Sequence, residues 1–230
     1  MKNLQRYQKV LYQRNSLLKN IKDGKSNKSE IEFWDNRLAE EASNIFFERN
    51  KIIKTITKSC KKFAKNFNNN INLDVKYLPK IGRNLENKFL DEDPSTDEIK
   101  LIFYESLKKN HNRDIDQRIT TIGPHRDDFE IVFNDSPASI TASRGQSRII
   151  SLSLKLSEAK EIRSITKRKP ILILDDIFSE LDENMRQKVV SEILDFDQIL
   201  LSTADIELID KNKISNGKYF SISEGEVSED

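Results

Sequence analysis

A short apolar run that ends in two acids restricts the possible folds of this 230-residue chain more than any other feature. Residues Ile171–Leu174 are all apolar, and Asp175 and Asp176 follow directly. A run this short and this apolar is typical of a strand buried on both faces in a parallel sheet. A predicted helix over about 183–194 and a second apolar run at 199–201 complete a strand-helix-strand unit. The sequence therefore predicts an α/β fold around this strand.

The two acids after this strand are the first candidate functional residues. Ligands of open α/β sheets collect at the carboxyl ends of the strands, where two adjacent carboxylates repel each other unless a cation neutralises them. In phosphoryl-transfer proteins an acid at this position binds Mg²⁺, and the next acid can orient or deprotonate the attacking water. Asp175 is therefore a candidate Mg²⁺ ligand and Asp176 a candidate general base. The alternative is a strand that ends in a polar turn capping the next helix.

The first half of the chain has mainly helical periodicity. Apolar residues recur every three or four positions over 4–21 and over 33–56, which predicts an antiparallel helix pair joined by a short polar turn after Asp23 and Gly24. Alternation at 73–77 predicts a short strand, and Ser95 with Glu98 forms a capping-box pattern ahead of a helix at about 96–109. Two further strands are expected around 119–122 and 129–133.

These patterns predict a helical region at 1–115, an α/β region at 116–223 and a frayed acidic tail at 224–230. The 6 glycines and 5 prolines fit a helix-rich globular protein. A single cysteine, Cys60, excludes a disulfide framework. No apolar stretch approaches the roughly 20 residues that cross a bilayer, and the first residues contain no signal-peptide core. We therefore expect a cytoplasmic protein with no membrane partner.

The segment that follows Ser143, Arg144, Gly145 and Gln146 fits two periodicities. Apolar and polar residues alternate over 150–156 as they would in a strand, but the apolar residues of 149–162 also fit one face of a helix. We predict a helix, because the stretch is longer than a typical strand and because a helix that starts behind Gly145 would direct backbone amides at a phosphate.

Short motifs in several parts of the chain carry a family resemblance. They are Gly-Pro-His-Arg-Asp-Asp at 123–128, Ser-Arg-Gly-Gln-Ser-Arg at 143–148, Leu-Lys-Leu-Ser-Glu at 154–158, Leu-Asp-Asp-Ile-Phe-Ser-Glu-Leu-Asp at 174–182, and the earlier Tyr-Gln-Arg-Asn-Ser-Leu-Leu-Lys at 12–19. In this order they resemble the RecF family of recombinational-repair ATPases, and the resemblance covers nearly the whole chain. The Gly-Pro-His-Arg-Asp-Asp motif is the most specific to that family.

The resemblance implies a P-loop NTPase of the ABC-ATPase head type, here with a partial sheet, together with an α-helical second lobe. Residues 143–146 then resemble the signature loop, which binds the ATP of the opposite protomer. Asp175 and Asp176 correspond to the Walker B acid and the catalytic base, although the family more often has Glu at the second position. Ser179 and Asp182 belong to the D-loop, which crosses the dimer interface.

The same resemblance implies ATP and Mg²⁺ as cofactors and a homodimer that closes over ATP and binds single-stranded or gapped DNA. It also implies a role in DNA replication, DNA repair and the SOS response, with RecO and RecR as partners. His125 and Arg126 could reach a phosphate, but a structural role at a strand end is the more common use of such a pair.

The sequence contains no Walker A loop, the Gly-rich turn whose amides and lysine hold the phosphates. Gly24-Lys25-Ser26 repeats the last letters of that motif, but Lys19 stands where its first glycine is required. The chain therefore resembles the C-terminal portion of a RecF protein, and we expect ATP hydrolysis only if a Walker A half completes it. The main alternative is an inactive or split-gene fragment that acts as a non-catalytic interaction module. A transporter nucleotide-binding subunit is a weaker alternative.

Basic residues are concentrated in the first 70 positions, which hold 16 Lys and Arg against 7 Asp and Glu, whereas the remainder holds 23 against 31. A net charge of +9 in one segment and −8 in the other indicates a nucleic-acid contact in the basic segment, with plain solvation of helix surfaces as the alternative. The candidate DNA contacts are Arg14, Lys19, Lys54, Lys58, Lys61 and Lys62.

Overall fold

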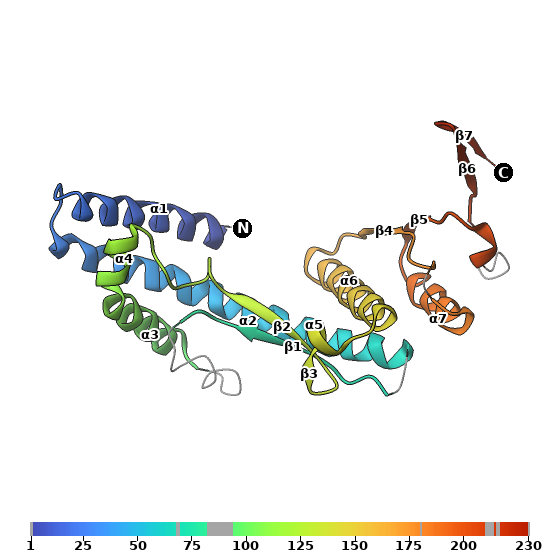
Figure 1. Ribbon diagram of the computed structural model, residues 1–230, viewed down its shortest axis with the longest axis horizontal. Coiled ribbons are helices and arrows are strands. Elements are labelled where there is room, and N and C mark those ends of the chain that lie inside the picture. Colours follow the sequence, from blue (N-terminus) through green and yellow to red (C-terminus); the bar gives the residue numbers. More distant parts are fainter. Residues whose placement is uncertain are drawn as a thin grey trace. The chain divides into compact units, whose positions relative to one another are not determined.

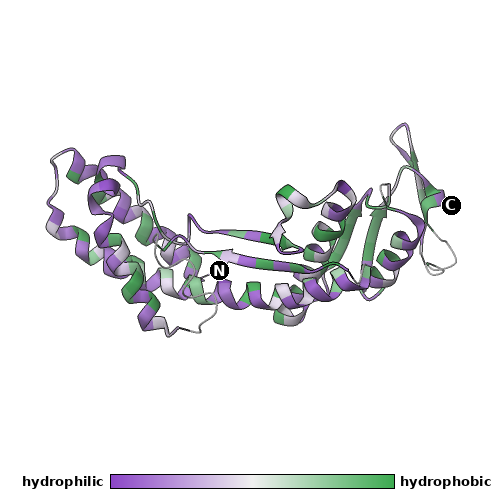
Figure 2. Cartoon of the chain, turned by 60° about the horizontal axis from the view of Figure 1, so that its bottom comes forward, coloured by the Kyte–Doolittle hydropathy of each residue, from purple (hydrophilic) through white to green (hydrophobic). Residues whose placement is uncertain are grey.

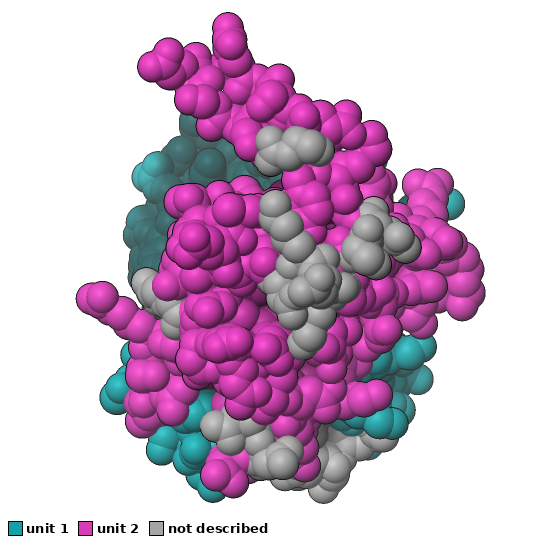
Figure 3. All heavy atoms as spheres, turned by 90° about the vertical axis from the view of Figure 1, so that its right-hand side faces the viewer, with its two compact units in different colours: residues 1–58, 73–140 teal, residues 59–72, 141–230 magenta. Residues whose placement is uncertain are grey.

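The structure is a computed structural model that describes residues 2–67, 70–81, 94–179, 181–209, 214 and 217–229. It contains two compact units (Figure 3). Unit 1 consists of residues 1–58 and 73–140, and unit 2 consists of residues 59–72 and 141–230. Residues 82–93, Glu180 of the predicted D-loop and Asp230 of the predicted tail lie outside the described residues.

Two long helices, α1 and α2, open the chain and confirm the predicted helix pair. Helix α1 spans Lys2–Lys22 and α2 spans Ile31–Phe67, with the short 3₁₀ helix η1 at Lys28–Glu30 between them. Gly24 closes α1 with a φ of 72°, a backbone conformation that side chains disfavour. In unit 1 the two helices lie side by side (Figure 1), because their apolar faces share one core. In this core Tyr7 of α1 packs with residues on one face of α2, namely Leu38, Ala42 and Phe46.

Two shorter helices complete the helical part of unit 1. Helix α3 spans Thr96–Lys109 and begins with the predicted capping box, in which Ser95 and Glu98 exchange hydrogen bonds. Helix α4 spans His111–Gln117 and was not predicted, because its seven residues contain a single apolar side chain, Ile115. Ile115 packs with Leu17 and Leu18 in a second small core.

A three-stranded antiparallel sheet lies in unit 1 in the order β1-β2-β3. Strand β1 spans Leu73–Leu78, β2 spans Asp128–Phe133 and β3 spans Ser136–Pro137, followed by the single turn α5 at Ala138–Thr141. The register places Val75 opposite Ile131 and Tyr77 opposite Phe129. This sheet brings together segments that lie on both sides of α3 and α4 in the sequence.

The strand predicted around 119–122 does not form. Instead of joining a ladder, the backbone amides of Thr120 and Thr121 donate to the side chains of Asn15 and Asp114, at 2.8 and 3.0 Å. The alternation of apolar and polar residues in this segment arises because Ile122 enters the core of unit 1 while the threonines face polar partners. The prediction was wrong because side chains, rather than a neighbouring strand, satisfy this backbone.

Unit 2 contains the predicted α/β elements. Helix α6 spans Arg144–Thr166, β4 spans Ile171–Asp175, α7 spans Glu183–Ile193 and β5 spans Gln198–Ser202. Strands β4 and β5 pair in parallel, so the strand-helix-strand unit is confirmed, and the segment after Ser143 is a helix. The last turns of α2 also belong to this unit. There the Lys188 ammonium donates to the Phe67 carbonyl, and the Lys160 ammonium lies 4.3 Å from the centre of the Phe63 ring.

Strand β4 is buried on one face rather than on both. Leu172 and Leu174 are 7% and 6% exposed, whereas Ile171 and Ile173 are 54% and 72% exposed. Apart from the polar residues at their ends, both strands of this parallel pair are nonetheless hydrophobic, at 171–174 in β4 and at 199–201 in β5 (Figure 2). The expectation of two buried faces is therefore wrong for the described residues, in which the second face of β4 has no covering element.

The described residues of the predicted acidic tail form a turn and a strand rather than a frayed end. Strands β6 at Phe220–Ser223 and β7 at Glu226–Glu229 form an antiparallel hairpin, with the short 3₁₀ helix η2 at Ile206–Leu208 earlier in the chain. Glu224 and Gly225 form its turn with φ values of 51° and 86°, the signs that a tight hairpin with a right-handed twist requires.

The compact units do not coincide with the division after residue 115 that the sequence suggested. Residues 116–140 belong to unit 1, because β2 pairs with β1 over six residue pairs. The C-terminal end of α2 belongs to unit 2 instead. Among the described residues, no helix combines the length and the apolar character that crossing a membrane requires.

Candidate functional site

The carboxyl end of β4 presents both predicted acids to solvent. Asp175, the last residue of β4, lies opposite Ser202 of β5, and the Ser202 hydroxyl donates to the Asp175 carboxylate. Asp176 follows with a φ of 45°, and its amide donates to the Ser202 carbonyl at 3.1 Å. Both acids are exposed. The strand end therefore directs two carboxylates outward while hydrogen bonds hold their backbone.

The donor set at this strand end suits Mg²⁺. Asp175 and Ser202 provide oxygen atoms, and Mg²⁺ is usually bound by one or two carboxylates together with substrate phosphates and water. The described part of the chain contains no group of three or more His, Cys, Asp or Glu side chains arranged to bind a metal ion. The residues present thus fit a metal ion that receives most of its ligands from a nucleotide and from water.

The predicted signature residues form the N-terminus of α6. Ser143 is the N-cap: its hydroxyl accepts from the Gln146 amide at 3.3 Å, and the Gln146 side chain accepts from the Ser143 amide at 2.8 Å. Among the described residues, and apart from its chain neighbours and its own helix backbone, no atom lies within 4 Å of where a side chain on Gly145 would begin. A helix N-terminus carries a partial positive charge, so this open turn is suited to an anionic group.

The predicted D-loop connects the strand end to α7. Asp182 caps α7 by accepting from the Met185 amide at 2.8 Å, and the Ser179 hydroxyl donates to the Asp176 carbonyl at 3.3 Å. Asp182 is therefore the N-cap of α7, and its role at a dimer interface stays a prediction.

Sequence reasoning missed Arg148. This residue of α6 donates from Nη1 to the Asp176 carbonyl and to the Ser179 hydroxyl oxygen, both at 3.1 Å. It thereby joins the signature helix to the strand end and to the D-loop. The sequence contained one signal for this role: Arg148 follows Gly145 by three residues and therefore lies on the same side of α6 as Gly145.

A hollow of about 810 Å³ adjoins these residues within unit 2. Its wall includes Arg148, Asp175 and Asp176 together with the exposed Ile171 and Ile173 of β4. The acids thus lie at the edge of a largely apolar surface.

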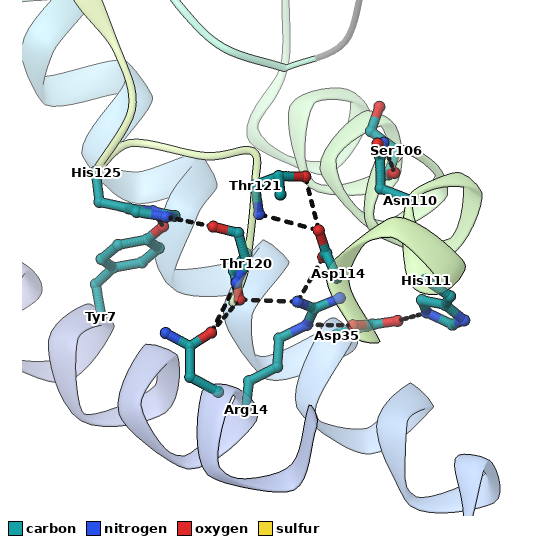
Figure 4. A network of polar contacts seen from close by, with 11 residues as sticks. Tyr7, Arg14, Asp35, Ser106, Asn110, His111, Asp114, Thr120, Thr121 and His125 are labelled. Atoms are coloured by element: carbon teal, nitrogen blue, oxygen red, sulfur yellow. Dashed lines mark hydrogen bonds and ion pairs between the residues drawn. The ribbon is translucent and has the colours of Figure 1, made fainter. Parts of the chain in front are cut away.

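The Gly-Pro-His motif lies in unit 1 and makes internal contacts (Figure 4). His125 contacts the Tyr7 hydroxyl at 2.6 Å and the Thr120 carbonyl at 3.0 Å. Gly123 has a φ of 116°, and a Cβ atom there would lie 2.8 Å from the Tyr7 hydroxyl oxygen. Glycine is therefore required at this position, both for its backbone conformation and for the approach of Tyr7.

The acid after this motif's Arg126 is likewise bound within unit 1. The Asp127 carboxylate accepts from the Tyr77 hydroxyl, from the Lys80 amide at 2.7 Å and from the Arg49 guanidinium at 3.2 Å. Arg126 itself is exposed. The contacts of His125 thus support a structural role for this residue. A phosphate contact by Arg126 stays a prediction.

Arg14 is not positioned to contact DNA. Its side chain is fully buried and forms ion pairs with Asp35 at 2.7 Å and Asp114 at 2.8 Å, both of which are also fully buried (Figure 4). Thr120 accepts a further hydrogen bond from it at 2.8 Å. The prediction of Arg14 as a DNA contact is corrected on this ground, because two carboxylates and a hydroxyl already use its guanidinium.

The remaining basic candidates lie on the helix pair. Lys19 of α1 is exposed, as are Lys54, Lys58 and Lys62 of α2, and Lys61 is half-buried. The α2 positions recur every three or four residues, which places most of them along one side of that helix. These lysines of α2, Lys54, Lys58, Lys61 and Lys62, form a cationic strip. Its positive charge is compatible with a contact to the phosphates of a nucleic acid.

Comparison with known proteins identifies the family. A "DNA replication and repair protein RecF" of Thermoanaerobacter sp. (strain X514) is 37% identical over 226 residues, which are 98% of this chain and 58% of that protein. The RecF protein of Clostridium perfringens (strain 13 / Type A) is 34% identical over 225 residues, again 98% and 58%. The chain belongs to the RecF family over the part that it spans. No protein-family model matches it.

Solved RecF structures share the fold. The recombination mediator protein RecF with ATP, of the RecFOR pathway, superposes with a TM-score of 0.80 at 31% identity, covering 99% of this chain and 57% of that one. A second RecF structure of that pathway gives a TM-score of 0.78 over the same shares. The fold is thus that of RecF, an ABC-type P-loop ATPase head with a partial sheet and a helical second lobe. The chain spans a little under three fifths of the length of the relatives it matches.

Proposed function

We propose that this chain supplies the signature and Walker B parts of an ATP-dependent RecF dimer that acts on DNA in replication and recombinational repair. The observation that carries the proposal is found in unit 2, where Arg148 of α6, the helix whose capped N-terminus contains the signature residues, donates to the backbone carbonyl of Asp176 at the end of β4. The relatives named above, called DNA replication and repair proteins, support the same function.

Each residue has a distinct chemical task in this proposal. Asp175, oriented by the Ser202 hydroxyl, would bind Mg²⁺, which when present neutralises charge on the nucleotide phosphates. Asp176 would orient the attacking water and accept its proton. Ser143 and Gly145, at the N-terminus of α6, would donate to the γ-phosphate of ATP bound by the opposite protomer.

The apolar face of β4 supports completion of this site by a further polypeptide segment. Ile171 and Ile173 are exposed beside the 810 Å³ hollow, and exposed apolar surface of this kind is characteristic of a face that packs against another element. We propose that a segment carrying a Walker A loop, of which these 230 residues contain none, packs there and binds the ATP phosphates. ATPase activity is proposed only for the completed protein.

DNA binding is assigned to the helix pair. Lys19, Lys58 and Lys62 are exposed cations on α1 and α2 that could contact phosphates. RecO and RecR are the proposed partners, in line with the RecFOR pathway of the similar solved structures. Preference for single-stranded or gapped DNA, a contribution to the SOS response and a cytoplasmic location remain predictions from the family resemblance.

ATP-dependent dimerisation tests the proposal. The chain is combined with a RecF polypeptide that carries the Walker A half, and the mass of the complex is measured by light scattering with and without ATP and Mg²⁺. We expect ATP to double the mass, and Ser143→Arg to prevent this because its side chain would fill the phosphate site. Ser191→Arg, the same change at an exposed serine of α7, is the control. A wild-type complex that neither binds ATP nor dimerises would support the non-catalytic interaction module instead.

A further inference from the structure

We propose that Arg148 is a positioning residue that couples the signature helix to the candidate general base, an inference that rests on the proposed function. Arg148 lies five positions after the N-cap Ser143, in the second turn of α6. Its Nη1 atom donates to the Asp176 carbonyl oxygen and to the Ser179 hydroxyl oxygen at equal distances of 3.1 Å. One cation from the signature helix therefore contacts both the catalytic turn and the D-loop.

The backbone of Asp176 needs such support. Its φ of 45° lies in the left-handed region, which residues with a Cβ atom disfavour and which persists where surrounding groups hold it. The Asp176 amide donates to the Ser202 carbonyl at 3.1 Å and contacts the Ser202 hydroxyl oxygen at 3.3 Å. On the other side, the Asp176 carbonyl accepts from Arg148 and from Ser179. Both peptide groups that set the direction of the Asp176 carboxylate are thus held.

The two sides of this turn are held by different elements. Ser202 belongs to β5, which is paired to β4 through the sheet and so moves with the acids. Arg148 belongs to α6, whose first turn contains the signature residues. A hydrogen bond from a guanidinium is stronger than one from a neutral hydroxyl, so Arg148 is the stronger of the two side-chain contacts to the Asp176 carbonyl.

In this arrangement the effect of Arg148 on the Asp176 turn depends on whether the signature residues at the N-terminus of α6 have bound a phosphate. When the N-terminus of α6 binds a phosphate, a shift of this helix moves Arg148 with it and so alters the Asp176 turn and the Ser179 hydroxyl. The signature of one chain would in this way adjust the general base of the same chain, so that hydrolysis follows dimer closure. Arg148 itself touches neither water nor nucleotide in this account.

Amide exchange in the 230-residue chain tests the positioning directly. The two reporter amides are hydrogen-bonded, Asp176 to Ser202 and Leu181 to Phe178. We expect Arg148→Met to speed their exchange about tenfold and Arg148→Lys to speed it less, because lysine keeps a cation but loses the planar donor group. The matched control is Arg163→Met, which removes an arginine of the same helix whose Nη1 lies 3.4 Å from the Asp195 carbonyl. Unchanged exchange of both reporters in Arg148→Met overturns the proposal.

Hydrolysis by the chain combined with a Walker A polypeptide tests the functional consequence. Arg148→Met should lower kcat about tenfold without changing KM for ATP, and Arg148→Lys should recover part of the rate, whereas Arg163→Met should keep the wild-type rate. A loss shared equally by Arg148→Met and Arg163→Met would show general destabilisation and contradict the coupling. If the wild-type mixture does not hydrolyse ATP, the proposed function fails, and the exchange experiment still decides whether Arg148 holds the turn.

Discussion

The Tyr7 hydroxyl lies 2.6 Å from Nδ1 of His125 and joins the first helix to the Gly-Pro-His motif (Figure 4). Nε2 of the same ring lies 3.0 Å from the Thr120 carbonyl oxygen, which can only accept. The geometry therefore assigns the ring proton to Nε2, so that Nδ1 accepts from Tyr7 in the neutral ring. The most family-specific motif in the sequence thus contributes to the packing of unit 1.

The environment of His125 predicts a pH-dependent contribution to stability. Burial of part of the ring lowers the pKa of His125, and the nearby charge of Arg126 lowers this pKa further. Because the folded pKa lies below the unfolded value near 6.5, the unfolded chain takes up the proton first as the pH falls, and the contribution of neutral His125 is lost below that pH. We expect His125→Gln to destabilise the chain more at pH 7.5 than at pH 5 in urea unfolding. An equal loss at both pH values would contradict this assignment.

The buried ion pairs of Arg14 predict a large loss of stability on substitution. Arg14→Met leaves Asp35 and Asp114 buried without their cation, and breaking a buried pair in this way costs about 3–5 kcal/mol. Lys19→Met, on the exposed side of the same helix, should change the free energy of unfolding by no more than about 0.5 kcal/mol. Urea titration of both variants measures the difference. A loss below about 1 kcal/mol for Arg14→Met would mean that the ion pairs contribute little.

Cys60 should be unreactive in the folded chain. Burial raises the pKa of its thiol to about 12, although a hydrogen bond with Ser157 opposes this rise. The reactive thiolate is therefore scarce at pH 8 as well as inaccessible. Labelling with a chromogenic disulfide reagent should detect no thiol in the native protein and one thiol per chain in denaturant. Rapid labelling of the native protein would place Cys60 at the surface.

The cationic strip of α2 predicts a measurable salt dependence of DNA binding. In the completed protein, Lys58→Gln combined with Lys62→Gln should reduce the slope of log affinity against log salt concentration by about 1.8, since each phosphate contact contributes about 0.9. Lys169→Gln combined with Lys218→Gln removes two cations that pair with acids of unit 2 and serves as the control. An unchanged slope in the first double variant would favour surface solvation as the role of these lysines.

Features determined by neighbouring residues could be predicted from the sequence. The capping boxes at Ser95 and Ser143 and the left-handed turn at Gly24 depend on residues close in the chain, and β4 and β5 belong to one continuous strand-helix-strand segment. The acids at the end of β4 could be recognised because a strand end and two carboxylates are adjacent in sequence. The same local signals identified α6 as a helix once the requirement for an N-terminus behind Gly145 was included.

Features determined by distant residues could not be predicted. Arg14 pairs with carboxylates 21 and 100 positions away, so its burial has no signature in the neighbouring sequence. The irregular segment at 119–122 depends on Asn15, which lies 105 positions from Thr120, as well as on the nearer Asp114. Arg148 was missed because its acceptors, the Asp176 carbonyl and the Ser179 hydroxyl, become neighbours only when α6 packs against the end of β4.

The most direct measurement of the central claim is the rate of ATP hydrolysis by the completed protein with Asp176→Asn, compared with its ATP-dependent dimerisation. The amide keeps the size and hydrogen-bonding capacity of the side chain but cannot accept a proton from water. We expect the variant to dimerise with ATP as the wild type does and to hydrolyse it about 10²–10⁴ times more slowly. Equal loss of dimerisation and hydrolysis would show that Asp176 is structural, and an unchanged rate would remove it from the reaction.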